Sequence, residues 1–460
     1  MKILKAYKFR LCPNKEQVSV LKQHGGNSRF IWNKLLEKAN DVKKQTGKFV
    51  FSQSLFQKQI KQLKAENEFT KLGYSQPIQY NALKLNETFI KAFDPENVAL
   101  RKQKIAKANA IEDPEKKAKA LAKALAYAFP KFKKKSDCYD SLFYPQHFIV
   151  KRSRILFPKI GWIHYIRHRD IEGKILSLNI TQDGSEQYYV SITCESEIAD
   201  RIKKPLDQAN IAGIDVGLEV FATLDNGEEI QNPRTLKKNL KKLRRANRKL
   251  SRQQLVETDK KTFNNKVIKE SSKRRDKQLL TLQRIHRKIR NIRKDFIYKT
   301  VYHIINTYDG VIMEKLDIQD MLQKGSRALN RSITDASWSE FARILGYKSA
   351  WLGKYFLQLD QYFPSTQLCN NCGNISHLSL KDRVYICPCC GMRAGRDINA
   401  ARNIKEEGLR ILREIYSTLS TNKSGSTVAA TGIYARGLTA LAVRKKREKR
   451  RFQQSVMTVA

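Results

Sequence analysis

Most of the cysteines of this sequence stand in one segment, which reads Cys369-Asn-Asn-Cys372, then fourteen residues, then Cys387-Pro-Cys-Cys390 and Gly395-Arg-Asp-Ile-Asn-Ala-Ala-Arg-Asn403. Two Cys-x-x-Cys knuckles at this separation supply four thiolates to one tetrahedral zinc ion, because each short knuckle folds two sulfur atoms toward a common point. The predicted ligands are Cys369, Cys372, Cys387 and Cys390. Four thiolates leave no open coordination position, so this zinc is expected to be structural, and any chemistry must come from other residues.

Details of the knuckles refine this prediction. Gly373 and Gly391 follow the second cysteine of each knuckle, where the chain must turn so that backbone N–H groups approach sulfur. Cys389 adds a fifth thiol and leaves the second ligand pair open, although Cys387 with Cys390 keeps the two-residue gap. His377 lies between the knuckles but off ligand spacing, so we expect it on the surface.

Three carboxylates stand in unusual settings. Asp215 lies in the apolar run Ile211-Ala-Gly-Ile-Asp-Val-Gly217, Glu314 closes Val311-Ile-Met-Glu314, and Asp397 begins an alanine-rich helical run. An ionisable group in an apolar strand is costly to bury unpaired, so Asp215 needs a metal ion or an ion pair. Magnesium and manganese prefer oxygen ligands, whereas an aspartate neutralised by a nearby arginine is the alternative for Asp215 taken alone.

Charge dominates the composition of this chain of 460 residues, whose length predicts two to four domains. The chain has 89 Lys and Arg against 44 Asp and Glu, a net charge of +45. Such an excess indicates a polyanionic partner, because phosphates are neutralised by lysine and arginine; a basic surface kept for solubility is the alternative. No apolar run reaches the roughly 18 residues that span a bilayer, and the N-terminus lacks a signal-peptide core, so we expect a cytoplasmic protein without membrane contact.

Strands and helices alternate in blocks along the first half. Residues 3 to 11 have strand period, Pro13-Asn14 starts a helix, and the helical pattern continues to about residue 130, with turns expected at Gly25-Gly26 and Gly73. Short strands follow between 143 and 195, ending in a hairpin joined through Asp183-Gly184. This order predicts one β-barrel with a helical insertion.

Two groups of basic residues are candidates for binding nucleic acid. Lys151, Arg152 and Arg154 lie near the aromatic residues Phe148, Trp162 and Tyr165, which suits RNA or single-stranded DNA, although Trp162 is expected in the core. The segment from 234 to 300 carries 25 Lys and Arg against 5 acidic residues and predicts two long helices, with Arg244, Arg245 and Arg248 on the basic face. A coiled coil is the alternative, and residues 257 to 273 are expected to form a mobile loop.

The second half begins with a β-meander typical of an RNase H-like fold, formed by the strand at 211 to 217, the strand at 220 to 224 and a third short strand. A strand ends at Glu314, a helix is expected over residues 335 to 352, and a helix resumes at Ile398. Residues 355 to 363 are expected to lead to the cysteine stretch. The tail from 421 to 460 is basic and aperiodic and is predicted to be disordered, with a possible role as an RNA-binding arm.

The Ile-Asp-Val-Gly strand, the apolar strand ending in Glu314, and the cysteine stretch running into Arg-Asp-Ile-Asn-Ala-Ala resemble the TnpB (OrfB) family of insertion-sequence proteins over roughly residues 1 to 410. The family carries a RuvC-type nuclease domain and is related to type V CRISPR effectors. The resemblance implies an α+β multidomain fold. Its parts would be a wedge-like β-barrel (1–11 and 131–203), an inserted helical recognition lobe (12–130), a RuvC-like domain (204–365 and 395–420), a zinc ribbon (366–394) and a tail (421–460).

The resemblance also implies an activity, an RNA-guided DNA endonuclease of a transposable element that hydrolyses phosphodiester bonds with two metal ions. Asp215, Glu314 and Asp397 would be catalytic and hold magnesium or manganese, beside the structural zinc. Partners would be a guide RNA encoded by the same element and double-stranded target DNA, with a monomer favoured. Gly395 departs from the family, many members of which have a second aspartate there. The alternatives are a nuclease-inactive DNA- or RNA-binding regulator or repressor and an autonomous DNA transposase.

Overall fold

The computed structural model describes residues 2–134, 141–199, 201–253, 256–261, 267–379 and 382–421, so nearly all of the predicted tail lies outside the described residues. The chain divides into two compact units. The first comprises Met1–Ile202 and Arg234–Phe296, and the second comprises Lys203–Pro233 and Ile297–Ala460. None of the helices in the described residues has the length and apolar character that a membrane crossing requires.

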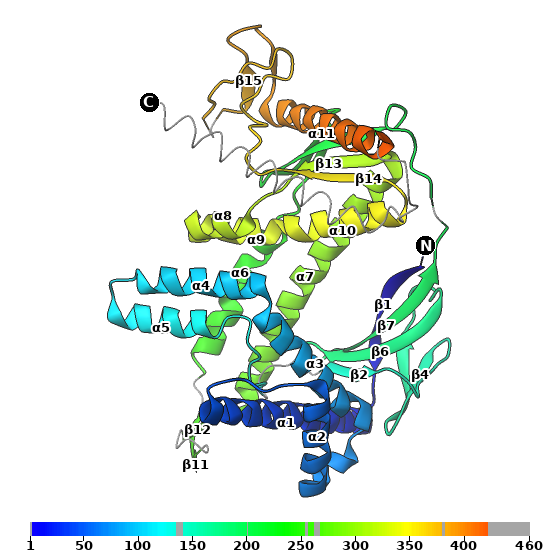
Figure 1. Cartoon of the computed structure of the whole chain (residues 1–460), viewed down its shortest axis with the longest axis vertical. Helices are drawn as coiled ribbons and strands as arrows, with labels where there is room; N and C mark the ends of the chain where they lie inside the picture. The colour runs from blue at the N-terminus through cyan, green and yellow to red at the C-terminus, as the bar shows by residue number, and fades with distance from the viewer. Residues whose placement is uncertain are drawn as a thin grey trace. The chain divides into compact units, whose positions relative to one another are not determined.

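A curled sheet of seven strands organises the first unit (Figure 1). In the order β2-β6-β7-β1-β5-β4-β3, its strands are β1 Lys2–Cys12, β2 Ser141–Tyr144, β3 Ile149–Val150, β4 Arg154–Phe157, β5 Gly161–Ile166, β6 Lys174–Gln182 and β7 Tyr188–Glu197. Strand β1 pairs antiparallel with β7 and β5, so the N-terminal strand and the later strands form one sheet, as predicted. In the described part of the chain no ladder joins β2 to β3, so this sheet is not a barrel closed by hydrogen bonds.

The helices between β1 and β2 are α1 Lys15–Thr46, α2 Gln53–Glu66, the 3-10 helix η1 Glu68–Leu72, α3 Ser75–Phe93, α4 Pro95–Asn109 and α5 Pro114–Leu125. Helix α1 begins where Pro13-Asn14 predicts, because Asn14 and Gln17 form a capping box. The turn expected at Gly25-Gly26 is wrong, since both glycines lie inside α1. Packing of the apolar stripe that includes Leu21 and Ile31 outweighs the roughly 1 kcal/mol that a helical glycine costs.

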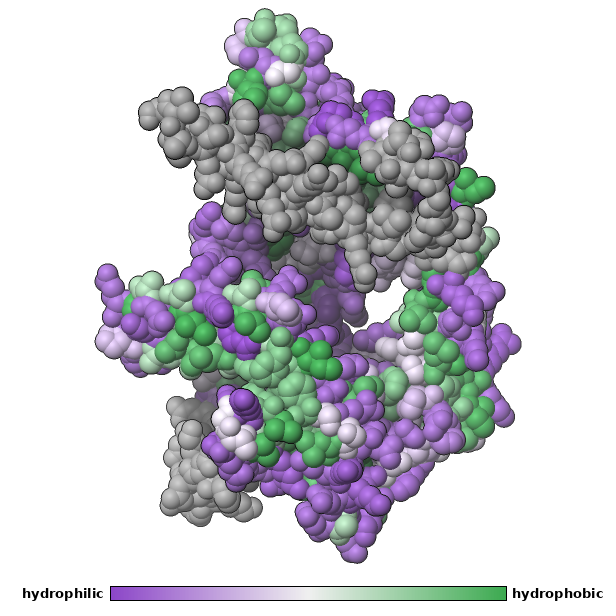
Figure 2. Space-filling model, in the orientation of Figure 1, coloured by the Kyte–Doolittle hydropathy of each residue, from purple (hydrophilic) through white to green (hydrophobic). Residues whose placement is uncertain are grey.

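Helices α4 and α5 bury little of their surface. Their buried residues are Ala108 and Ala124. Exposed apolar side chains, among them Phe93, Leu100 and Leu125, gather over α3, α4 and α5 (Figure 2). The inserted helices therefore hold their main core in α1, α2 and α3, around Leu35, Phe56 and Phe89 in a cluster of buried side chains.

Two helices carry the basic segment, α6 Thr235–Ser251 and α7 Lys273–Thr307. Their apolar faces pack together, because Leu243 and Ala246 of α6 form one buried cluster with Leu282 and Ile289 of α7. The mobile loop expected at 257 to 273 is wrong where the structure describes this segment, and residues 262–266 lie outside the described residues. Strands β11 Val256–Lys261 and β12 Val267–Glu270 pair antiparallel there, and the β-branched residues in this stretch favour that conformation.

A five-stranded sheet organises the second unit in the order β10-β9-β8-β13-β14. Its strands are β8 Ile211–Val216, β9 Val220–Leu224, β10 Glu229–Gln231, β13 Gly310–Glu314 and β14 Tyr355–Leu359. The antiparallel meander β8-β9-β10 is confirmed. Strands β8, β13 and β14 are parallel, and β14 forms where the sequence predicts a connecting segment.

The remaining elements of this unit are α8 Ile318–Lys324, α9 Arg327–Ala336, α10 Trp338–Trp351, β15 Val384–Ile386, β16 Arg393–Gly395 and α11 Arg396–Thr421. Helices α10 and α11 cover opposite faces of the sheet (Figure 1). Gly346 of α10 lies against the Phe356 ring, and Gly408 of α11 lies against Ile312. Both helices can approach the strands closely because glycine has no side chain at these contacts.

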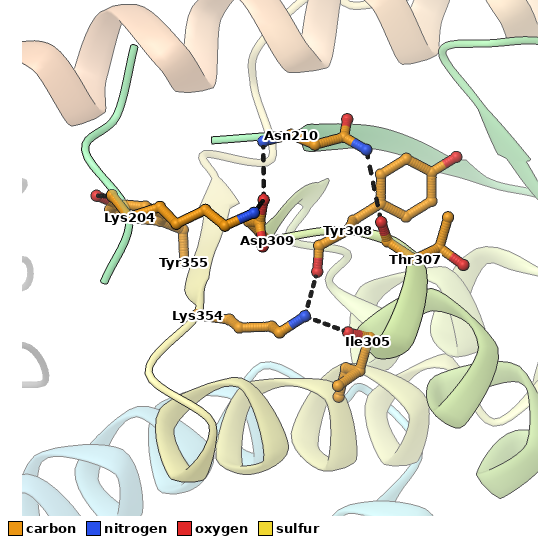
Figure 3. A network of polar contacts seen from close by, with 8 residues as sticks. All are labelled: Lys204, Asn210, Ile305, Thr307, Tyr308, Asp309, Lys354 and Tyr355. Carbon is orange, nitrogen blue, oxygen red and sulfur yellow. Dashed lines mark hydrogen bonds and ion pairs between the residues drawn. The ribbon is translucent and has the colours of Figure 1, made fainter. Parts of the chain in front are cut away.

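A polar network fixes the turn between α7 and β13 (Figure 3). Lys354 donates to the Tyr308 carbonyl oxygen at 2.8 Å, Lys204 lies 2.8 Å from Asp309 Oδ2, and the Asn210 N–H donates to the same carboxylate at 3.2 Å. The hydrogen bond from Lys204 is the main cause that lowers the pKa of Asp309. Because these residues precede β8, β13 and β14, the network sets the starting point of all three parallel strands.

Candidate functional site

Asp215 and Glu314 lie side by side at the carboxyl ends of two parallel strands. In the ladder between β8 and β13, Ile214 is opposite Met313, and the two acidic residues are the next along each strand. Residues opposite one another in neighbouring strands point to the same face, and neighbouring strands lie about 4.8 Å apart. The two carboxylates therefore share one edge and one face of the sheet.

Helix α11 brings Asp397 to the same place. Gly213 lies two residues before Asp215 on the same face, and a Cβ there would lie 2.1 Å from the Ala401 carbonyl oxygen. The backbone of α11 thus rests directly on β8, which the full burial of Ala401 also shows. Asp397 lies one helical turn before Ala401, toward the end of β8 that carries Asp215.

The electrostatics agree with this arrangement. Burial, and then the charges of Asp397 and Glu314, raise the pKa of Asp215 to about 8, while Arg396 acts in the opposite direction. Burial raises the pKa of Glu314 to about 7. No ion pair in the described ranges includes Asp215 or Glu314, whereas Arg396 Nε lies 3.4 Å from Asp397 Oδ1. Acidic groups crowded in this way, with too little positive charge, fit a divalent cation with oxygen ligands.

The four predicted cysteines form the second cluster. The sulfur atoms of Cys369, Cys372, Cys387 and Cys390 all lie within 4.8 Å of one another, and within the described residues this is the one such group of possible metal ligands. The three carboxylates do not approach one another that closely. Cys389 is exposed and is not part of the cluster, as its spacing predicts. Four convergent thiols fit a tetrahedral zinc ion.

The turns of the two knuckles follow the glycine prediction. Gly373 and Gly391 have φ of 74° and 69°, and their N–H groups donate to the carbonyl oxygens of Cys369 and Cys387. The Asn371 side chain donates to Cys390 Sγ at 3.5 Å and is the main cause that lowers the pKa of this thiol to about 6. His377 is exposed, as expected.

Two buried asparagines, whose roles the sequence analysis missed, tie α11 to the cysteine cluster. Asn399 accepts from the Asn370 N–H at 3.1 Å and donates to the Leu368 carbonyl oxygen at 2.7 Å. Asn403 donates to the carbonyl oxygens of Ser365 and Leu368. Their spacing of four residues in the quoted motif was a usable signal, since it places both on one helical face. The first turn of α11 therefore links Asp397 to the first knuckle.

The predicted nucleic-acid contacts are exposed. Arg244, Arg245 and Arg248 lie on the solvent side of α6, where Arg244 and Arg248 line a shallow hollow. Lys151, Arg152 and Arg154 are also exposed. These six side chains are accessible to a polyanion.

The aromatic residues near Lys151 are not placed as expected. Lys151 Nζ lies 4.9 Å from the centre of the Trp162 ring, and Trp162 is 37% exposed, so the expectation that it lies in the core is wrong. The alternation of β5 turns Ile163 and Tyr165 inward and Trp162 outward. Trp162 is therefore the accessible stacking face in this group.

A basic chain with a carboxylate-bearing mixed sheet, a four-thiol cluster and exposed arginine-rich helices has the features of proteins that bind nucleic acid. Three family descriptions match it, "Probable transposase" (OrfB_IS605) over residues 191–325, "Cas12f1-like, TNB domain" over 338–404 and "Helix-turn-helix domain" (OrfB_IS605) over 1–48. In the structure this last segment folds as strand β1 and the single helix α1.

Two similar proteins agree with these matches. "Putative RNA-guided DNA endonuclease InsQ" of Escherichia coli (strain K12) is 28% identical over 90% of this chain and 94% of its own length. "TnpB-like protein L79" of Acanthamoeba polyphaga mimivirus is 31% identical over 44% of this chain and 38% of its own length. A solved Cas12f1–sgRNA–target DNA complex aligns with a TM-score of 0.30 and 15% identity, over 87% of this chain and 98% of that one. Over residues 1–48 and 191–325 the chain thus matches the family models of OrfB_IS605 proteins, and its relatives include a named TnpB-like protein.

Proposed function

We propose that this protein is an RNA-guided DNA endonuclease of a transposable element, with a RuvC-like, metal-dependent catalytic site. The observation that carries the proposal is the meeting of Asp215, Glu314 and Asp397 at one edge of the five-stranded sheet. The printed name of the Escherichia coli relative, which matches along nearly its whole length, supports the same activity. The sheet order, with an antiparallel meander followed by two parallel strands, supports an RNase H-like fold.

Asp215, Glu314 and Asp397 are proposed to hold magnesium or manganese. Divalent cations, when bound, make water nucleophilic at neutral pH and neutralise charge on the phosphate and the leaving oxygen. Asp215 and Glu314 have raised pKa values, so each carboxyl must release its proton to act as a ligand. Glu314 approaches from β13 and Asp397 from α11, which fixes their positions through two different elements.

The cysteine cluster is proposed to hold a structural zinc ion that positions α11. Asn399 and Asn403 connect this helix to the segment that contains Cys369. A zinc ion that fixes the first knuckle would, through these hydrogen bonds, also fix the first turn of α11, where Asp397 lies. A guide RNA encoded by the same element and a double-stranded DNA target are the proposed partners, and the net charge of +45 suits both.

The two alternatives are disfavoured on different grounds. A nuclease-inactive regulator does not need three acidic groups crowded at one edge of a sheet, at the cost of the raised pKa values of Asp215 and Glu314. An autonomous transposase could use the same carboxylates, but it needs no guide RNA. Recovery of a specific RNA with the purified protein separates these two activities.

The test is cleavage of radiolabelled target DNA by the protein with its copurified RNA, started by adding magnesium. Replacing Asp215, Glu314 or Asp397 by Ala should each lower the cleavage rate on the order of 10³-fold, because several kcal/mol of transition-state stabilisation are lost. Combined replacements should lower it little further, since one site is dismantled in each case. DNA binding should stay close to wild type.

The matched control is Glu229→Gln, which removes an exposed acid from the same sheet and should leave cleavage unchanged. Calcium should not replace magnesium, because its looser coordination positions the attacking water poorly. An Asp215→Ala variant that cuts as fast as wild type would refute the assignment. Target binding without cleavage in magnesium or manganese would favour the regulator.

A further inference from the structure

One stripe of α7 meets the turn between β6 and β7 inside the first unit. Gln283, Arg287, Arg290 and Lys294 follow one another at spacings of four, three and four residues and so share a helical face. Arg287 Nη1 donates to Ser185 Oγ at 2.6 Å. Farther along the stripe, Arg290 Nη2 donates to Asp183 Oδ2 at 3.3 Å. This stripe therefore holds the hairpin against the helix and ends at Lys294.

Two further cations come from β1. Lys8 is opposite Ser191 and Arg10 is opposite Tyr189 in the ladder with β7, so all four side chains share one face of the sheet. Lys8 Nζ lies 4.6 Å from the centre of the Tyr189 ring. The pKa of Lys8 is lowered in part by the charges of Lys294 and Arg290. The pKa of Tyr189 is raised by burial, and this rise is opposed by the charges of Arg287, Arg290 and Arg10. We call Lys8, Arg10, Arg287, Arg290, Lys294 and Tyr189 the Tyr189 cluster.

The cluster has far more positive than negative charge. Among the described residues, Asp183 supplies the negative charge that raises the pKa of Lys8. Its carboxylate already accepts hydrogen bonds from Ser185 Oγ and from the N–H groups of Ser185 and Gln187. Within the described residues neither Lys8 nor Lys294 takes part in an ion pair. Partial burial of the Lys8 ammonium, and then Lys294 and Arg290, lower the pKa of Lys8. Holding these cations together is unfavourable unless an anion joins them.

We propose that Lys8, Arg290 and Lys294 of the Tyr189 cluster bind a phosphate group of a nucleic-acid strand that continues across the outer face of the seven-stranded sheet. A phosphate has several acceptor oxygens and takes donors from different directions, which a helix and a strand provide together here. The inference rests on the proposed function, because it assigns a contact for the nucleic acid that the enzyme would bind.

The course of the strand follows from the register of the sheet. Cys12 is opposite His164 in β5, and His164 is opposite Arg154 in β4. Opposed residues share a face, so Arg154 lies on the same face as Lys8 and Arg10. Trp162 points outward from β5 on this face as well. Separate phosphates of one polyanion can therefore reach several cations across these strands, whereas a single free phosphate ion cannot.

The test compares two double variants with the same net charge. Lys8→Gln with Lys294→Gln removes two cations of the cluster. The control, Lys2→Gln with Lys288→Gln, removes two exposed lysines from the same strand and the same helix, Lys2 beside Glu195 and Lys288 on another stripe of α7. Binding is measured without divalent metal over a series of salt concentrations, with the copurified RNA and with RNA and DNA oligonucleotides of one mixed sequence.

The cluster variant should bind at least one of these nucleic acids more weakly than the control. Its plot of log affinity against log salt should be flatter by about 0.7 for each phosphate of a single strand that the variant no longer neutralises. A change with RNA alone or DNA alone identifies which strand occupies the site, and inorganic phosphate should not compete at comparable concentrations. Equal slopes for the two double variants on every probe would overturn the inference.

The outcome is distinct from that of the proposed function. If the protein cuts its target but the two slopes are equal, the endonuclease assignment stands and the phosphate site is wrong. If the protein never cuts but the cluster variant has the flatter slope, the phosphate site stands and the endonuclease assignment is wrong. Melting temperatures of both variants confirm that a change in slope does not come from unfolding.

Discussion

Gly213 lets us test whether the contact between α11 and β8 positions the three carboxylates that we propose to be catalytic. In Gly213→Ala the new Cβ would lie 2.1 Å from the Ala401 carbonyl oxygen and 2.7 Å from Lys405 Cβ. Contacts of real Cβ atoms essentially never fall below 3.0 Å, so helix and strand must separate by about 0.9 Å. Overpacking of this kind costs about 1–3 kcal/mol of stability. A misplacement near 1 Å costs on the order of 100-fold in rate.

The assay is cleavage of labelled target DNA by the purified complex in magnesium, together with thermal unfolding. Gly213→Ala should cut about 100-fold more slowly than wild type while it still binds RNA, because the basic helices are untouched. The control is Gly395→Ala, close to Asp397 in sequence, where a new Cβ meets Ile398 at an ordinary 3.5 Å and should change little. If Gly213→Ala folds and cuts at the wild-type rate, α11 does not position Asp397 against Asp215.

Three further predictions concern metal content, pH and the turn before β13. Cys389→Ser should retain zinc and Cys387→Ser should lose it; equal loss in both, measured by metal analysis, would contradict the ligand assignment. Burial, and then the charge of Lys159, lower the pKa of His24 to about 4, below its value in the unfolded chain. The unfolded chain therefore binds this proton first as the pH falls, so the stability that neutral His24 contributes above about pH 6.5 decreases by roughly 3 kcal/mol toward pH 4. Chemical unfolding at several pH values should show this loss in wild type and in the exposed control His164→Asn but not in His24→Leu. Lys354→Met removes the donor to the Tyr308 carbonyl oxygen, so it should destabilise the protein by about 1–3 kcal/mol and slow cleavage. A variant with the melting temperature and cleavage rate of wild type would exclude a role for the network.

Periodicity and capping carried much of the fold prediction. Strand β1, the capped start of α1, the β6–β7 hairpin and the meander β8-β9-β10 have local signals, and each appears as predicted. The failures lie where distant contacts decide. Gly25 and Gly26 remain helical because the rest of α1 is packed, and β14 becomes a strand because its partner β13 lies beside it.

The candidate site was predictable in part. Sequence spacing favoured the four cysteines that converge in the structure over Cys389, because ligand geometry in a short knuckle is a local property. Placement of the three carboxylates depends on a parallel ladder and on glycine contacts between elements far apart in the sequence. Gly213 therefore gave no visible signal of its role until β8 and α11 were placed together, whereas the spacing of Asn399 and Asn403 was a usable signal.

Asp225 shows why a carboxylate at the end of an apolar strand does not define a site by itself. It directly follows the buried strand β9, and Glu314 is likewise the last residue of β13. In the structure, however, Asp225 lies 2.7 Å from Lys405 Nζ and accepts a hydrogen bond from the Gly213 N–H at 2.9 Å. Its charge is therefore neutralised within the protein, and it helps to hold α11 on β8. Asp215 and Glu314 form no ion pair among the described residues; burial raises the pKa of both, and the charges of Asp397 and Glu314 raise that of Asp215 further. The partners of each acid therefore separate the two cases: the packing of α11 gives Asp225 the cation of Lys405, whereas it gives Asp215 a further negative charge, that of Asp397.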